Sequence, residues 1–252
     1  MRQFNYIDED LTDRFTGSFN KFLGNMLPPE DCASISYKIM QSETFQHFTH
    51  LWLREGGRNR KAGTSMHSIY GGFLYQEAAR FCCIAKEKKE LLSLSHQHYE
   101  TFLEIKEGKK EVNYFVQWQK GLVEELLEYE WVRVEKTLLD AVKFCPDRGE
   151  AFQHVIQHFR RAREWDIAYK FSSIAKEQFH GKFPLENRWF ADAHFYQWKI
   201  LNYHASICYH LGYNMEASEA FNLLWKCWEK HPEYFTDAQK EILGKNKALF
   251  KN

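Results

Sequence analysis

The sequence of 252 residues is poor in proline, with only five in total and none between residues 30 and 145. Proline removes a backbone donor and clashes with the preceding turn, so a long stretch without it allows helices to continue. Long hydrophobic runs are also missing, which predicts no membrane-spanning helix. The N-terminus turns acidic before any apolar segment, which argues against a secretory signal. We therefore expect a cytoplasmic protein.

An excess of one charge is absent as well. The 34 basic side chains equal the 34 acidic ones, and the isoelectric point is near 7.2. A neutral chain offers no general attraction for nucleic acid or an anionic membrane, so neither is an expected partner. The six cysteines are scattered and form no C-x-x-C pair, which is typical of reduced thiols inside helices.

Motifs that would fix a reaction are absent too. The sequence contains no G-x-S-x-G element, no phosphate-binding G-x4-G-K-S/T loop and no G-x-G-x-x-G element. It therefore predicts no catalytic residue and no cofactor, and a non-enzymatic role is favoured.

Helical periodicity is what the sequence does contain. From residue 30 onward, apolar residues recur three and four positions apart, with very little two-residue alternation. This pattern predicts an all-α protein. A glycine-rich basic loop at 54–61 is the clearest break, so we expect an N-terminal segment over 1–65 and a helical domain over 66–252. The predicted helices are 30–54, 65–87, 90–106, 111–128, 131–144, 149–162, 165–179, 189–211, 214–230 and 235–249.

An internal period runs through the second of these parts. Glu130 and Trp131 recur as Glu164 and Trp165, 34 residues later, and Ala141 recurs as Ala175. Thirty-four residues is the tetratricopeptide period, in which small side chains such as Ala168 let the paired helices approach closely. The period predicts a solenoid of antiparallel helical hairpins.

A third copy of the pattern comes after a longer gap. Its small residues are Ala205, Gly212 and Ala217, the last of which follows Ala168 by 49 residues. Because 49 exceeds the repeat length, we expect an insertion over about 179–190 to loop out between the second and third copies.

Three runs carry a resemblance to a known group of proteins. They are Lys143 to Phe152, Phe195 to Leu201 and Cys208 to Tyr213. In this order, they resemble the tetratricopeptide-like helical tail that follows the catalytic domain of many family-two glycosyltransferases, here without that domain. The resemblance covers roughly 66–230, with Arg163 in place of the usual turn glycine. It implies a helical scaffold and no catalytic residue, and it suggests an accessory subunit of a glycosyltransferase system.

A solenoid binds its partners on the concave face, which the first helix of each pair lines. In the 34-residue register, one repeat contributes a polar strip with two cations, and the next adds a third cation. Such a strip suits an acidic peptide, a terminal carboxylate or a polar sugar. The predicted groove residues are Gln153, Gln157, Arg160, Arg161, Lys199, Asn202, Ser206, Tyr209 and His210. The preceding repeat continues the strip with Val116, Gln119, Val123, Leu126 and Leu127, as an exposed apolar segment.

Histidines supply the one candidate for metal chemistry. His154 and His158 share a helix face with Glu150, one turn earlier. A bundle metalloenzyme would need a second helix with a matching pattern, which the sequence lacks, so we expect structural histidines. The preferred function is a non-catalytic scaffold that binds a protein or peptide. The alternatives are the glycosyltransferase accessory subunit and a metalloenzyme based on these three residues.

Overall fold

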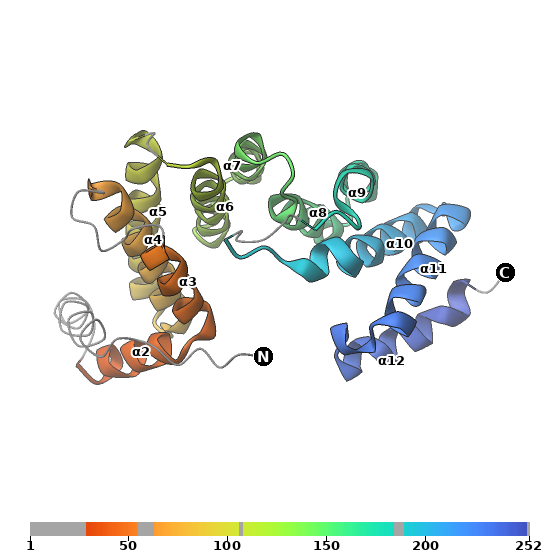
Figure 1. Ribbon diagram of the computed structural model, residues 1–252, viewed down its shortest axis with the longest axis horizontal. Helices are drawn as coiled ribbons and strands as arrows, with labels where there is room; N and C mark the ends of the chain where they lie inside the picture. The colour runs from red at the N-terminus through yellow and green to blue at the C-terminus, as the bar shows by residue number, and fades with distance from the viewer. Residues whose placement is uncertain (1–28, 55–62, 106–107, 184–188, 251–252) are drawn as a thin grey trace. The chain divides into compact units, whose positions relative to one another are not determined.

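The computed structural model describes residues 29–54, 63–105, 108–183 and 189–250, and these are helical with no strand among them. The all-α prediction is therefore confirmed for this part of the chain (Figure 1). Contacts divide the chain into two compact units, Met1–Val134 and Glu135–Asn252. The sequence-based division at residue 65 stays a prediction. The helices before this residue pack against the helix that begins beside it, and all of them belong to the first unit.

The first unit contains α2 (Pro29–Gln41), α3 (Glu43–Arg54), α4 (Gly63–Phe81), α5 (Ala85–Ile105) and α6 (Lys110–Leu126). The prediction of one helix over 30–54 is wrong, because the chain breaks at Ser42. The Ser42 amide donates to the Ile39 carbonyl, and the Ser42 hydroxyl accepts the Phe45 amide at 3.4 Å. Serine thus caps the first turn of α3, as short hydroxyl side chains commonly do. The predicted basic loop over 54–61 lies, beyond Arg54, outside the described residues.

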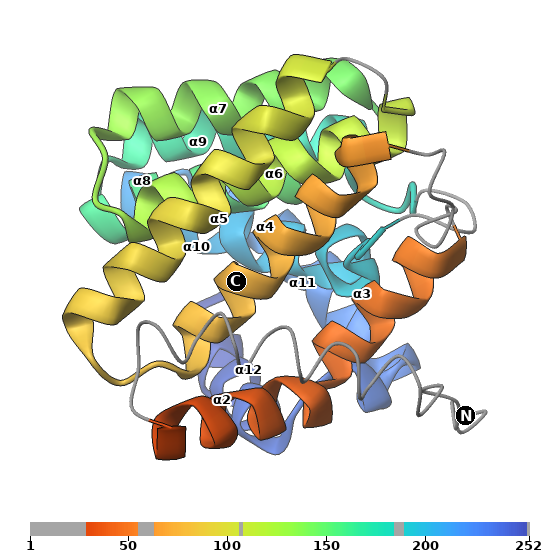
Figure 2. The same cartoon turned by 90° about the vertical axis from the view of Figure 1, so that its left-hand side faces the viewer.

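The core of the first unit lies where α4 packs along α5 (Figure 2). Gly72 permits this approach, because a Cβ atom there would lie 2.5 Å from the Tyr99 ring. The Ser95 hydroxyl donates to the Gly72 carbonyl at 2.7 Å and joins the two helices. Phe48 of α3 stacks on Phe73 of α4, with ring centroids 4.1 Å apart. Aromatic side chains therefore fill this core, as the 17% aromatic content suggests.

The second unit contains α8 (Glu150–Ala162), α9 (Trp165–Phe179), the π-helical turn η2 (Phe195–Lys199), α10 (Ile200–Leu211) and α11 (Asn214–Lys230). Each of the four α-helices packs on its neighbour in the chain, and α8 also contacts α10. Helix α7 (Trp131–Phe144) runs across the division between the units. The helices predicted over 131–144, 149–162, 165–179 and 214–230 are confirmed to within a residue or two. The helix predicted over 189–211 begins later, because residues 189–192 are not helical.

The alanines of the predicted register are buried, whereas Gly212 lies in an exposed turn. None of Ala141, Ala168, Ala175, Ala205 and Ala217 exposes more than 3% of its surface. Their burial agrees with close helix contacts, since a short side chain lets two backbones approach. That these helix pairs build a tetratricopeptide-like solenoid stays a prediction.

Three interhelical turns share one backbone conformation. Glu128, Arg163 and Gly212 end α6, α8 and α10 with φ of 60°, 60° and 75°. At each turn the amide of this residue donates to the carbonyl three residues earlier, and the next amide donates to the carbonyl five residues earlier. These two bonds define the Schellman motif, which satisfies the last carbonyls of a helix. Glu128 and Arg163 lie 35 residues apart, one more than the 34-residue register, so the shared turn is a recurring local structure and the register stays a prediction.

A buried ion pair at the start of α8 holds the chain at Trp189, near the end of the predicted insertion. The Arg148 and Glu150 side chains are almost fully buried and lie 3.0 Å apart, from Nε to Oε2. Arg148 also donates to the carbonyl of Trp189, and Glu150 accepts the amide of Asp192. The Trp189 side chain is fully buried. Trp189 is therefore anchored, whereas residues 184–188 lie outside the described residues, and the looping out of the insertion stays a prediction.

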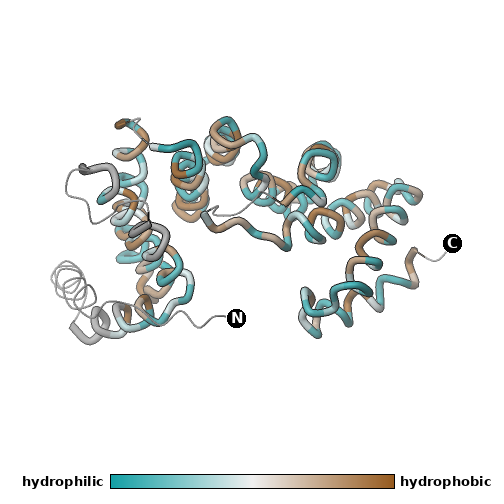
Figure 3. Tube along the Cα trace, in the orientation of Figure 1, coloured by the Kyte–Doolittle hydropathy of each residue, from teal (hydrophilic) through white to brown (hydrophobic). Residues whose placement is uncertain are grey.

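The C-terminal segment adds η3 (Pro232–Tyr234), α12 (Asp237–Asn246) and the short turn η4 (Lys247–Phe250). Phe235 and Leu243 join a core cluster with residues of α10 and α11, and Phe250 stacks on Phe221 at 4.5 Å. Hydrophilic and hydrophobic residues are mixed along the helices (Figure 3). Within the described ranges, no helix combines the length and hydropathy that a bilayer crossing requires.

Candidate functional site

The predicted row of groove residues on α8 contacts Tyr203 of α10. The Tyr203 hydroxyl accepts the Gln157 side-chain amide at 2.6 Å and lies 3.4 Å from that of Gln153. The Arg160 guanidinium lies over the Tyr203 ring, 4.9 Å from its centroid. Three of the four predicted α8 residues therefore contact one side chain of α10, which the sequence register omits. That the two rows form one groove stays a prediction.

The five residues of the second predicted row, one in η2 and four in α10, line two shallow cavities. One cavity of about 190 Å³ is bounded by Asn202, Ser206, Tyr209 and His210, together with residues of α11, α12 and η4 such as Phe250. A second cavity of about 230 Å³ lies between Lys199, Asn202 and the side chains of α12. Because α12 lines both cavities and η4 lines the first, the C-terminal segment covers part of the face that the sequence predicts to be open.

The cations of this face already have partners. Lys199 forms an ion pair with Asp192 at 2.5 Å, and the Arg161 guanidinium donates to Gln157 at 3.3 Å. The exposed His210 stacks on Trp165 of α9, with ring centroids 4.1 Å apart. An incoming anion would therefore compete with one carboxylate at Lys199, but with no carboxylate at the cation–π contact of Arg160.

The predicted apolar continuation of the groove is wrong. Val116 and Val123 are fully buried, and Gln119 and Leu127 are nearly so. Of the five residues, only Leu126 is exposed, with 54% of its surface accessible. The apolar side of α6 faces the interior of the first unit, where α6 packs on α5 and α4. The apolar residues that recur along α6 therefore form the buried face of this helix and do not line a groove.

The predicted metal candidate does not assemble. Glu150 is bound to Arg148 in the buried pair, and the three residues Glu150, His154 and His158 do not form a metal-capable group. Burial, together with the nearby Arg161 and Lys199, lowers the pKa of His154 to about 4. His154 is therefore a neutral packed side chain at pH 7, as the structural interpretation expected.

A different histidine does meet two metal-ligand side chains, and the sequence analysis missed this group. Among the described residues, His204, Cys208 and Glu216 form the one group of this kind, with ligand atoms within 4.8 Å of one another. His204 and Cys208 lie four residues apart on α10, and Glu216 lies in the first turn of α11. The sequence signal that could have revealed this group is a histidine and a cysteine four residues apart, His204 and Cys208, followed by the acidic Glu216 just after the turn.

The surroundings of this group fix its hydrogen bonds. His204 Nε2 lies 2.8 Å from Glu216 Oε1 and 3.5 Å from Cys208 Sγ, while Nδ1 faces the Ser172 hydroxyl at 3.0 Å. Burial and the negative charge of Glu216 raise the pKa of the Cys208 thiol to about 12. Partial burial of the Glu216 carboxyl acts to raise its pKa. Hydrogen bonds from Tyr169 and His204 outweigh this effect, so the pKa of Glu216 lies below its usual value.

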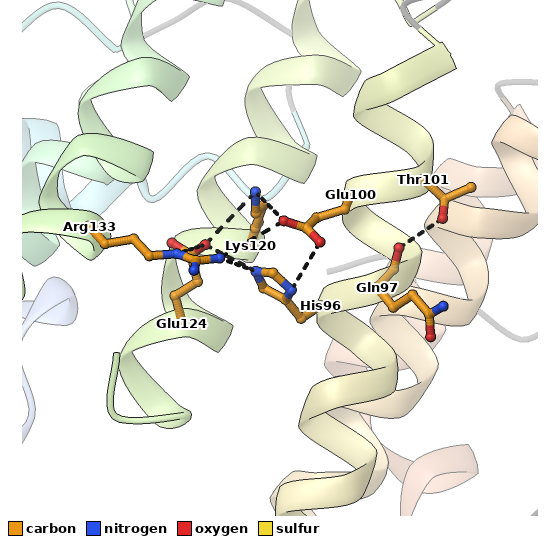
Figure 4. Close-up of polar contacts among 7 residues, drawn as sticks. All are labelled: His96, Gln97, Glu100, Thr101, Lys120, Glu124 and Arg133. Atoms are coloured by element: carbon orange, nitrogen blue, oxygen red, sulfur yellow. Dashed lines mark hydrogen bonds and ion pairs between the residues drawn. The ribbon is translucent and has the colours of Figure 1, made fainter. Parts of the chain in front are cut away.

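A second polar cluster ties together α5, α6 and the start of α7 in the first unit (Figure 4). The buried Glu124 carboxylate lies 3.0 Å from His96 Nε2, 3.1 Å from Arg133 Nε and 3.8 Å from Lys120 Nζ. Glu100 lies 3.1 Å from Lys120 and 3.9 Å from Arg133. Two carboxylates thus balance one lysine and one arginine. This balance suits a structural clamp better than a ligand site.

Comparisons with protein-family models, curated proteins and solved structures find no match to this chain.

Proposed function

We propose that the second unit is a helical-repeat binding module that takes an acidic peptide across its α8–α10 face, without catalytic turnover. The observation that carries this proposal is the contact of the α8 row with Tyr203, which lines a cavity together with Lys199 and Asn202 of the second row. Gln157 and Arg160 of α8 reach this one tyrosine of α10, so both helices present polar groups to the same strip. Strips of this kind, built from adjacent first helices, are where helical repeats bind extended segments.

The chemistry of the strip supports an acidic occupant. Arg160 and Arg161 lie on α8, Lys199 begins the α10 segment, and amide or hydroxyl groups stand between them. Guanidinium groups pair with carboxylates in a forked geometry, and amides accept or donate as the backbone of an extended peptide requires. The two cavities beside α10 would receive side chains that fix the peptide's register.

The resemblance to glycosyltransferase tails suggests one source for the acidic segment. A separately encoded glycosyltransferase that carries such a segment would make this chain its accessory subunit. We keep this as the alternative function, and co-purification with a sugar-nucleotide-dependent enzyme would test it.

An array of short synthetic peptides tests the binding module directly. The array pairs each acidic peptide with a counterpart in which lysine replaces the acids, and fluorescence anisotropy then measures selected peptides in solution. We expect acidic peptides to bind and their basic counterparts not to bind. Added salt should weaken this binding, because ion pairs at an exposed surface are screened.

Charge reversal locates the site. The double variant Arg160→Glu with Lys199→Glu should abolish peptide binding while its melting temperature stays close to that of the parent. The matched control is Lys170→Glu with Lys226→Glu, which reverses two exposed charges on the second helices α9 and α11. Equal loss of binding in both double variants would show a general charge effect, and an array without any acidic binder would refute the proposal.

A further inference from the structure

The group at the α9–α10–α11 junction is made of side chains that bind transition metals. His204 and Cys208 are fully buried, whereas the Glu216 side chain is 31% exposed and gives access from the surface. We propose that His204, Cys208 and Glu216 bind a divalent metal ion of the zinc class, with the fourth position open to water. Imidazole, thiolate and carboxylate are the three protein ligands that zinc takes most often.

The distances fit such an ion with a small movement of one side chain. Zinc bonds of roughly 2.3 Å to sulfur and 2.0–2.1 Å to nitrogen place the two atoms about 3.5 Å apart at a tetrahedral angle. Cys208 Sγ and His204 Nε2 are 3.5 Å apart. Glu216 Oε1 lies 2.8 Å from His204 Nε2, and a shift of about 1 Å in this partly exposed carboxylate completes the third position.

The second ring nitrogen of His204 already has a hydrogen-bond partner outside the group. Nδ1 lies 3.0 Å from the Ser172 hydroxyl, which also donates to the Tyr169 carbonyl at 3.1 Å. A metal ion would take the place of the proton in the 2.8 Å hydrogen bond between Nε2 and Glu216 Oε1, while Nδ1 keeps its contact with Ser172. Ligating histidines usually hold their second nitrogen in such a bond, which orients the ring.

A cysteine nucleophile is the competing interpretation, and the geometry opposes it. In a thiol–imidazole–carboxylate relay, the thiol and the carboxylate face different ring nitrogens. Here Cys208 and Glu216 both face Nε2, so the ring cannot pass a proton from one to the other. Cys208 is also fully buried, out of reach of a substrate.

Metal binding joins α10 to α11 through a coordinate bond on each side of the turn at Gly212. The ion displaces the Cys208 thiol proton, which leaves to solvent, and no electron is transferred. Lys176 Nζ lies 3.6 Å from Glu216 Oε1 and is 29% exposed, so its ammonium group opposes the ion's charge. Binding therefore requires Lys176 to turn toward solvent.

Cobalt(II) titration of the full-length, reduced protein tests the site, because cobalt occupies tetrahedral nitrogen–sulfur sites and is visible. We expect a thiolate-to-cobalt charge-transfer band and intense visible bands that saturate near one equivalent and disappear when zinc is added. The Cys208→Ala variant should lose the charge-transfer band. The matched control Cys227→Ala, a half-buried cysteine of α11, should retain it. Absence of the band in the parent protein, or its persistence in Cys208→Ala, would overturn the proposal.

Two further variants test the site where Cys208→Ala fails to fold. Glu216→Gln should weaken cobalt binding at least several-fold at a partly exposed position that tolerates the change. Lys176→Gln should tighten it by about ten-fold, because a repelling charge near the ion is removed. Lys170→Gln removes an exposed lysine from the same helix and should leave the affinity unchanged. An unchanged affinity in both Glu216→Gln and Lys176→Gln would refute the assignment.

Discussion

Arg163 occupies the same place in its helical hairpin as Gly212 does 49 residues later. Both residues have left-handed backbone angles, φ of 60° and 75°, and both close the first helix of a pair with the same two backbone bonds. Glycine adopts this conformation freely, whereas the Cβ atom of arginine is strained in it. One of the two equivalent turns therefore carries a residue that disfavours its own conformation.

Relief of this strain should stabilise the protein. We expect Arg163→Gly to raise the free energy of unfolding by about 0.5–1 kcal/mol, measured by urea denaturation. Arg161→Gly is the matched control, since this residue lies inside α8. There the same change should lower stability by about 0.5–1 kcal/mol, because glycine is a poor helix former. A loss of stability at position 163 would contradict the assigned turn.

The buried alanines of α9 should not tolerate larger side chains. Ala168 and Ala175 are fully buried, and leucine at either position must displace a neighbouring helix. We expect Ala168→Leu and Ala175→Leu each to cost about 1–3 kcal/mol in thermal or urea denaturation. Ala162→Leu, at the exposed end of α8, should change stability by less than about 0.5 kcal/mol. Unchanged melting of the first two variants would show that these positions are not tightly packed.

The buried pair of Arg148 and Glu150 should be strongly coupled. Each single change, Arg148→Met or Glu150→Leu, leaves one buried charged partner uncompensated, and should cost about 3–5 kcal/mol. The double change Arg148→Met with Glu150→Leu should cost less than the sum of the single changes. Lys143→Met, in the exposed pair with Asp140, should cost no more than about 1 kcal/mol. Additive losses at 148 and 150 would disprove the coupling.

Acid should destabilise the protein through His154. Its pKa is lowered from 6.5 to about 4 in the folded state, chiefly by burial, so the unfolded chain binds more protons between these values. The free energy of unfolding should therefore fall as the pH drops from about 6.5 to about 4. In His154→Gln this contribution to the slope should vanish, and above pH 7 the two proteins should differ by a constant amount. If the free energy of unfolding falls with pH equally in the parent and in His154→Gln, groups other than His154 cause the acid sensitivity.

The helices themselves were predictable because their signals are local. Helices α8 to α11 follow from two local features, the turns at Arg163 and Gly212 and the spacing of apolar residues. Neither feature depends on which other helices lie nearby. The break at Ser42 was missed, since one serine within an apolar pattern does not by itself stop a helix. Its hydroxyl acts as a cap only once the chain has turned.

The candidate sites depended on which helix faces meet. Periodicity assigned Gln157 and Lys199 to one face, which stays a prediction, and it could not reveal that the α8 row contacts Tyr203. The same spacing of four residues occurs in His154–His158 and in His204–Cys208. Only the second pair meets a carboxylate from the next helix, and that meeting depends on the packing of α10 against α11.

By itself, the amino-acid order determined the helical class, most helix limits and the buried small residues, because each follows from contacts between residues a few positions apart. Tertiary packing decided that α6 turns its apolar face inward, that α12 covers part of the α10 face, and that His204 faces Cys208 and Glu216. These outcomes join residues of different helices, and their partners are chosen by the shape and charge of surfaces that exist only after the helices pack.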